Sequence, residues 1–170
     1  MRQIEYWGKI PIIPCSRLLN PEAKDDQDLG EYERELFAWG RVCHRIVEKT
    51  YSKPWLSEFR ATYPQTDTLR RALKLPFFIS YHPDLYNPEE QTVADVKSVS
   101  VEDEGLPRDQ AILQLSSYAH FLGVKRAKII YYEVVKTREE DVEVIPFDRL
   151  RSVWLEGWRR LVKLGRVILK

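Results

Sequence analysis

The chain has 170 residues, of which 44% are hydrophobic and 31% are charged, and its formal net charge is +1. These fractions are typical of a folded globular protein and exclude a chain that is disordered over its length. No apolar run reaches the ~20 residues that span a bilayer, and residues 1–7 lack the apolar core of a signal peptide. We therefore expect one domain, residues 1–170, inside a cell and most simply in the cytoplasm.

The chain has two cysteines, Cys15 and Cys43. Two cysteines far apart in an intracellular chain are more often free thiols than a disulfide. They also cannot build a four-cysteine zinc or iron–sulfur site without other ligands.

The first half of the chain predicts one long helix between irregular segments. Residues 1–20 read as an irregular or short-strand lead-in, and residues 22–28 as an acidic loop. A helix is predicted over Glu31–Tyr51, because apolar residues recur there at helical spacing (Leu36, Trp39, Cys43, Ile46 and Val47). Residues 52–71 have no clean period, which indicates a loop with a turn or two of helix.

The second half predicts strands and two helices. Strands are expected over Leu75–Tyr86, which Pro83 bends or interrupts, and over Gln91–Val99, with a turn at residues 87–90 between them. Further strands are expected at Ala127–Lys136 and Asp141–Pro146, around a turn at residues 137–140. The predicted helices are Pro107–Leu122, which follows a loop at residues 102–107, and a basic C-terminal helix, Arg149–Leu169, capped by Asp148.

The fold class that these elements predict is α/β (α+β). A central mixed sheet is flanked by helices in the order αβββαβ, and the basic helix closes the chain. In that last helix, Leu150, Trp154, Trp158 and Leu161 form an apolar stripe that is expected to cover the sheet.

The most informative polar residues lie in the predicted strand pair. Asp95 and Lys97 share one face of a strand, because strand side chains alternate with period two, and hairpin pairing would bring Asp84 alongside. At an effective dielectric of about 20, two like charges ~4 Å apart repel by about 4 kcal/mol, which a proton or a cation would relieve. Two aspartates and the carbonyl of Val96 suit Mg²⁺ or Mn²⁺, and Lys97 could orient water or stabilise a phosphate. From spacing alone, a turn-capping Asp84 and a surface Asp95–Lys97 pair fit equally well.

Three further features of the sequence indicate a functional site only when they are taken together. His44 lies on the first helix, one turn after Gly40, and becomes a ligand candidate only if it faces the two aspartates. Gln114 and Tyr118 are four apart on one helix and could contact a phosphate or stack on an unpaired base, although a half-exposed helix flank would look the same. Cations on the last helix and around residues 108 and 125–128 could attract phosphate, or belong to an ordinary amphipathic surface.

The order of these residues resembles the PD-(D/E)xK nuclease superfamily, within it the RecB-type exonuclease branch, which includes the exonucleases of CRISPR adaptation. The resemblance runs from about Gly40 to Tyr132, and residues 114–123 (QLSSYAHFLG) are its most family-like piece. It implies a restriction-endonuclease-like core and Mg²⁺- or Mn²⁺-dependent hydrolysis of DNA. The resemblance is compatible with an archaeal chain or a viral one acting in a host cell.

The resemblance also implies a role for each site residue. His44, Asp84 and Asp95 would be metal ligands, with the Val96 carbonyl assisting, and Lys97 would be the catalytic lysine beside Asp84 and Asp95. Gln114 and Tyr118 would contact DNA near the scissile phosphate.

One feature of the CRISPR-associated relatives is missing from the sequence. Those relatives hold an iron–sulfur cluster on one N-terminal and three C-terminal cysteines, whereas here no cysteine follows Cys43. We therefore expect no iron–sulfur cluster.

Three functions stay open at this point. The first is a metal-dependent DNA nuclease, acting on single strands or DNA ends as an exonuclease or an endonuclease. The second is a non-catalytic nucleic-acid-binding module on the same fold, and the third is a structural or partner-binding protein. The expected partners are DNA and, beyond it, a second copy of the chain or a helicase or repair protein; no membrane is expected.

Overall fold

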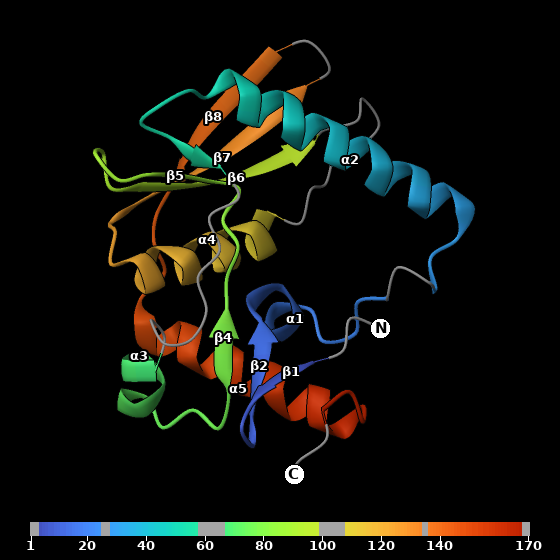
Figure 1. The fold of residues 1–170 in the computed structure, drawn as a ribbon, viewed down its shortest axis with the longest axis vertical. Coiled ribbons are helices and arrows are strands. Elements are labelled where there is room, and N and C mark those ends of the chain that lie inside the picture. The colour runs from blue at the N-terminus through green and yellow to red at the C-terminus, as the bar shows by residue number, and fades with distance from the viewer. Residues whose placement is uncertain (1–3, 25–27, 58–66, 99–107, 134–135, 168–170) are drawn as a thin grey trace.

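In the computed structural model, residues 4–24, 28–57, 67–98, 108–133 and 136–167 are described. They form two mixed sheets with helices around them (Figure 1). The larger sheet has the strand order β3-β5-β6-β7-β8, with bounds Leu56–Ser57, Leu85–Asn87, Thr92–Ser98, Arg126–Glu133 and Lys136–Val142. The smaller sheet has the order β1-β2-β4, with bounds Glu5–Trp7, Ile10–Pro14 and Phe78–Ser80. The helices α1 to α5 are Cys15–Leu19, Glu31–Thr50, Asp67–Ala72, Arg108–Leu122 and Phe147–Lys163.

The larger sheet lies between α2 and α4 (Figure 1). Residues of β6 alternate between two apolar clusters, as strand geometry requires. Val93 packs with Leu115 and Ala119 of α4 in the main cluster, whereas Ala94 and Val96 pack with Val47 of α2 in a smaller one. The main cluster continues through α1 and α5 to the smaller sheet, so one apolar core joins the two sheets.

The predicted α+β class is confirmed, with one difference in the sheet. The expected strand over residues 75–86 is interrupted at Pro83, as predicted, and its two parts, β4 and β5, belong to different sheets. The expected hairpin is present, because β5 and β6 pair antiparallel with Leu85 opposite Ala94. Asn87 stabilises its turn by accepting the backbone N–H groups of Glu89 and Glu90, both at 3.0 Å.

Several predictions in the second half were wrong, among them the strand over Asp141–Pro146, since β8 ends at Val142. Residues 137–140 do not form a turn but belong to β8, an edge strand whose charged side chains pair across to β7, as Glu139 does with Lys128. Asp148 does not cap the last helix: the N-cap is Pro146, and Asp148 lies in the first turn, where a carboxylate still favours the helix dipole. The helix also ends at Lys163, before the expected Leu169. The predicted loop over residues 102–107 lies outside the described residues.

The N-terminal segment and α2 also differ from expectation. Residues 15–19 form a short helix, α1, which no periodicity in so few residues could indicate. In α2, Cys43 and Val47 are buried, whereas Leu36, Trp39 and Ile46 are exposed. The N-terminal part of the helix, which carries Leu36 and Trp39, extends beyond the sheet (Figure 1). None of the described helices is long and apolar enough to cross a bilayer.

Helix α5 crosses α1 at Gly157, where the two backbones come into direct contact. A Cβ on Gly157 would lie 1.9 Å from the carbonyl oxygen of Leu18, which is backbone and cannot move aside alone. The buried Trp154 and Leu161 flank this crossing and anchor α5 in the main core.

Gly157→Ala is therefore predicted to destabilise the fold. Overpacking costs about 1–3 kcal/mol, which outweighs the ~1 kcal/mol that alanine gains over glycine in a helix. The matched control is Gly40→Ala in α2, where a Cβ would meet only the Ser98 Oγ, at 3.6 Å. Urea unfolding should show a loss for Gly157→Ala and no loss for Gly40→Ala; equal stabilities would contradict the close crossing.

Candidate functional site

Asp84 lies where the chain passes from the smaller sheet to the larger one, directly before β5. Its Oδ2 accepts the backbone N–H of Val96 on β6 at 2.7 Å, so the side chain continues the pairing that Pro83 interrupts. Its Oδ1 lies 3.4 Å from the Nδ1 of His44 on α2. The carboxylate is thus held at both oxygens by two other segments of the chain.

His44 reaches Asp84 because α2 packs closely on β6. One turn earlier, a Cβ on Gly40 would make only an ordinary 3.6 Å contact with the Oγ of Ser98 at the end of β6. The sequence left open whether His44 meets the aspartates. The structure brings His44 to Asp84 and leaves its ring partly exposed, at 33%.

Asp95 and Lys97 form the second half of the site, on the same face of β6. The Asp95 side chain is buried, with only 2% of the residue exposed, and its Oδ2 lies 2.6 Å from the Lys97 Nζ. This contact is an ion pair without hydrogen-bond geometry, so among the described residues the Asp95 Oδ2 has no hydrogen-bond partner. Buried polar atoms are normally satisfied, so this oxygen needs a physical explanation.

The pKa values show how strongly these four groups interact. Burial and, to a smaller extent, the charge of Asp84 raise the pKa of Asp95 to about 6, against the opposing effect of Lys97. Burial also raises the pKa of Asp84, but the hydrogen bond and charge of His44 overcome this and lower it. Burial lowers the pKa values of His44 and Lys97, whereas their carboxylate partners raise both by more. The pKa values of the two aspartates are therefore shifted in opposite directions.

The donor types at this site suit a hard divalent cation. Carboxylate oxygens are the usual ligands for Mg²⁺ or Mn²⁺, whereas an imidazole is more typical of transition metals, and the Oδ2 of Asp95, now paired with Lys97, is a further oxygen that could bind a cation. As they stand, no three His, Cys, Asp or Glu side chains of the described residues form a ready-made metal cluster. Asp84 and His44 contact each other instead, so a cation would bind in exchange for that pair.

Gln114 and Tyr118 lie on the same side of α4, as predicted, and the Gln114 Nε2 donates to the Tyr118 hydroxyl at 2.6 Å. Tyr118 is only 2% exposed and packs beside Tyr81, so its ring cannot stack on an unpaired base. That part of the prediction was wrong, because α4 turns this face toward the core. A DNA contact through the half-buried Gln114 stays a prediction.

The sequence missed two residues next to the site. Cys15 at the start of α1 is buried, and its pKa is raised to about 12 by burial, with a smaller contribution from the charge of Asp95. Tyr131 lies opposite Lys97 on the parallel strand β7 and adds to the raised pKa of Lys97. Strand alternation could have indicated Tyr131, whereas only the tertiary fold brings Cys15 near.

Several cations that were expected to attract phosphate have partners within the chain. Arg108 pairs with Glu140, and Lys128 lies 2.8 Å from Glu139. On α5, Arg160 pairs with Glu156, and downstream of the helix Arg166 donates to the backbone carbonyls of residues 21 and 23. These cations stabilise the fold, which supports the alternative of an ordinary amphipathic helix.

No protein-family model and no curated protein matches this chain. Among solved structures, the crystal structure of SSO0001 is similar over 96% of this chain and 79% of that chain, with a TM-score of 0.64 and 13% sequence identity. A phage-related exonuclease from Haemophilus somnus 129PT covers 91% of this chain and 95% of its own, at 12% identity and a TM-score of 0.43. The similarity to SSO0001 shows the fold alone, and that to the exonuclease is too low to carry an argument. The family that the sequence resembles therefore stays a prediction.

If the site holds a cation, Mn²⁺ should raise the melting temperature, because a ligand bound only by the folded state stabilises it. The increase should be small at pH 5, where an Asp95 carboxyl with a pKa of about 6 is mostly protonated, and full above pH ~7. Protonation of His44 acts in the same direction, since its pKa is also raised.

Thermal unfolding with and without Mn²⁺ measures this effect. Asp95→Asn should remove the shift, whereas Asp141→Asn, at an exposed carboxylate on β8, should keep it. A shift of equal size in Asp95→Asn would place the cation elsewhere.

Proposed function

We propose that this chain is a divalent-metal-dependent nuclease that hydrolyses phosphodiester bonds in DNA and acts on single strands or DNA ends. One observation carries the proposal. His44 on α2 lies 3.4 Å from Asp84, and Asp84 accepts the N–H of Val96, the residue between the buried Asp95 and its ion-pair partner Lys97, so three separate segments bring these four side chains to one region.

Each residue has a role that its surroundings support. Asp84, Asp95 and His44 would hold Mg²⁺ or Mn²⁺, with the Val96 carbonyl assisting. When bound, such an ion polarises a phosphate and makes its water a better nucleophile. Lys97 stays protonated, because its carboxylate neighbours raise its pKa, so it would stabilise the charge of a phosphate rather than act as a base.

The same charges argue against a module that only binds nucleic acid. Two neighbouring carboxylates repel a phosphate backbone unless a cation lies between them. A structural protein is disfavoured by the placement of His44 against Asp84, which a set of unrelated surface residues would not require.

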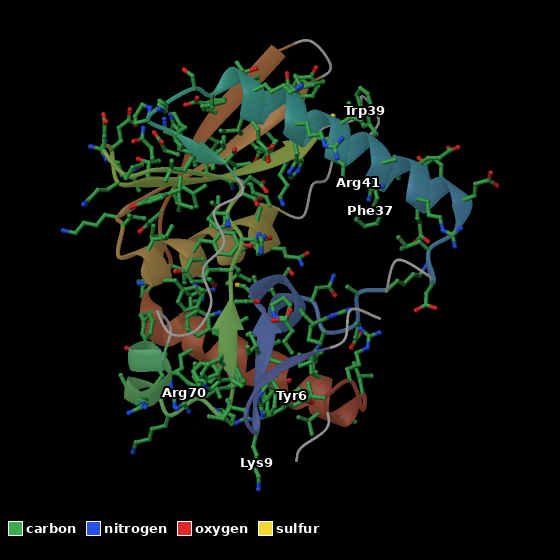
Figure 2. The ribbon with its side chains drawn as sticks, viewed as in Figure 1. Tyr6, Lys9, Phe37, Trp39, Arg41 and Arg70 are labelled. Carbon is green, nitrogen blue, oxygen red and sulfur yellow. The ribbon has the colours of Figure 1, made fainter. Side chains whose placement is uncertain are left out.

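The decisive assay uses end-labelled linear and circular single-stranded DNA with Mn²⁺. Lys97→Ala should lower the cleavage rate by about 100-fold or more, because it removes a charge at the reacting phosphate. Lys9→Ala is the matched control, because Lys9 is exposed at the turn between β1 and β2, far from α2 (Figure 2). Its cleavage rate should be unchanged.

The products separate the remaining alternatives. Cleavage of the circle would establish endonuclease action, and fragment sizes from the linear strand would give the direction of an exonuclease. DNA binding that weakens steeply with salt but yields no metal-dependent product would favour the binding module. Full cleavage by Lys97→Ala would refute the proposed role of the lysine.

A separate prediction concerns the two cysteines, which we expect to be free, buried thiols that hold no iron–sulfur cluster. Burial raises the pKa of Cys15 to about 12, so its thiol should resist iodoacetamide at pH 8 until the protein unfolds. Mass spectrometry of alkylated peptides measures this, and Cys43, which is also buried, should behave alike. Stoichiometric iron in anaerobically purified protein would contradict the prediction.

A further inference from the structure

Helix α2 carries most of the exposed apolar surface of the described chain. Of the nine large apolar side chains that the described residues expose, six lie on this helix: Tyr32 at 67%, Leu36 at 44%, Phe37 at 56%, Trp39 at 42%, Val42 at 45% and Ile46 at 39%. A concentration of this kind on one element is unusual for a monomeric surface and marks an interaction site.

Five of the six share one side of the helix. Helical geometry places Tyr32, Leu36, Trp39, Val42 and Ile46 along one strip, which we call the outer stripe. Phe37 lies on the flank that carries His44, and Figure 2 shows Trp39 and Phe37 on opposite sides of α2. The outer stripe is therefore separate from the candidate catalytic site.

The charges on α2 divide between its two halves. Residues 31–38 carry three glutamates and one arginine, a net charge of −2, whereas residues 39–50 carry three basic residues and one glutamate, a net charge of +2 with His44 neutral. Acids near the start and bases near the end also favour the dipole of a single helix. That effect does not explain the exposed aromatic and aliphatic side chains between them.

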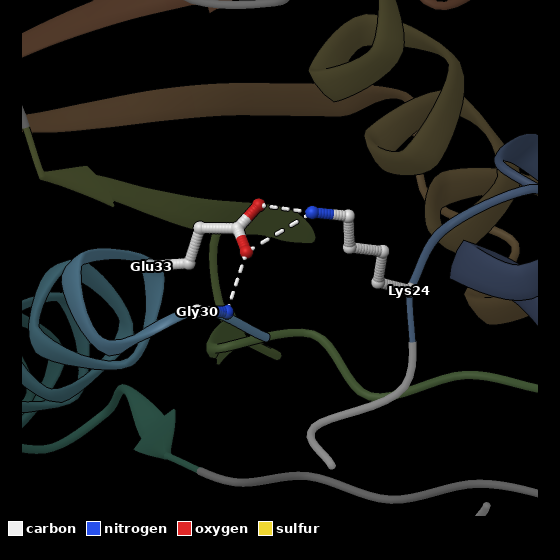
Figure 3. A network of polar contacts seen from close by, with 3 residues as sticks. All are labelled: Lys24, Gly30 and Glu33. Carbon is white, nitrogen blue, oxygen red and sulfur yellow. Dashed lines mark hydrogen bonds and ion pairs between the residues drawn. The ribbon is translucent and has the colours of Figure 1, made fainter. Parts of the chain in front are cut away.

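The start of α2 is held in a defined position, so the stripe is presented on an ordered helix. Glu33 accepts the backbone N–H of Gly30 at 2.8 Å and an ion pair from Lys24, also at 2.8 Å (Figure 3). These contacts lie on the side of α2 away from the outer stripe and leave it free for a partner.

We propose that the outer stripe binds a second copy of this chain, with the two α2 helices antiparallel about a two-fold axis. This orientation sets the acidic half of each helix against the basic half of the other, whereas a parallel pair would oppose like charges. On the flank of the stripe, Glu35 of one copy would face Arg45 of the second, and Glu31 would face Lys49. Trp39, near the middle of the helix, would lie close to the axis in both copies.

The size of the contact sets the expected affinity. A helix of 20 residues is about 30 Å long, and a pair of such helices buries less than the ~800 Å² per partner of a standard interface. We therefore expect a dimer with a micromolar dissociation constant, which sedimentation equilibrium over a concentration series can measure.

Two substitutions on α2 test the apolar contacts of the proposed dimer. Trp39→Ala should weaken dimerisation by about tenfold or more, because buried tryptophans dominate such contacts. Phe37→Ala is the matched control, since Phe37 is more exposed than Trp39 on the same helix but lies outside the outer stripe, and it should leave the dissociation constant unchanged. Circular dichroism verifies that both variants keep their helices.

Charge reversal tests the antiparallel orientation. A basic variant, Glu31→Lys with Glu35→Lys, and an acidic variant, Arg45→Glu with Lys49→Glu, should each be monomeric, whereas an equimolar mixture should dimerise. Recovery in the mixture also shows that neither variant has misfolded. A wild-type protein that stays monomeric at every concentration, or a dissociation constant that Trp39→Ala leaves unchanged, would overturn the proposal, and each readout is independent of nuclease activity.

Discussion

The hydrogen bond between the Asp84 carboxylate and the Val96 N–H is the contact on which the arrangement of the site depends. It lies at the junction of the two sheets, where the backbone pairing of β5 with β6 ends and the carboxylate, in place of a backbone carbonyl, accepts the Val96 N–H. The same carboxylate lies against His44 and so ties α2 to the junction. Asp84 thus links the segment between the two sheets to β6 and to α2.

Burial at this junction has an energetic cost that the rest of the fold must offset. Asp95 is almost fully buried next to another carboxylate, its pKa is raised to about 6, and its Oδ2 has no hydrogen-bond partner among the described residues. Lys97 offsets only part of the cost of burying the Asp95 carboxylate, since the pKa of Asp95 remains raised even with Lys97 beside it. The large apolar core, from Val93 through Leu115 to Trp154, supplies the compensating free energy. Unfavourable electrostatics at a site held by a rigid core is the usual relation between stability and function.

Helix α2 serves two faces of the molecule through different residues. Its C-terminal half buries Cys43 and Val47 and brings His44 to the site, whereas its N-terminal half extends past the sheet with aromatic side chains exposed. Because the helix is one rigid element, a partner bound along the outer stripe would also hold the element that positions His44. Association and the candidate catalytic centre would then share one helix without sharing side chains.

The sequence by itself determined the α+β class, the hairpin that carries Asp84 and Asp95, and the positions of α2 and α4, because these depend on local periodicity and on turn residues. It also indicated Asp95 and Lys97 as neighbours, since alternation along one strand is a local rule. Only the tertiary structure decided that His44 meets Asp84, that Tyr118 is buried, that residues 137–140 form an edge strand, and that half of α2 is uncovered. Each of these depends on which faces of distant segments come together. Which faces meet is decided by the packing of the whole core, so it cannot be predicted from any short stretch of neighbouring residues.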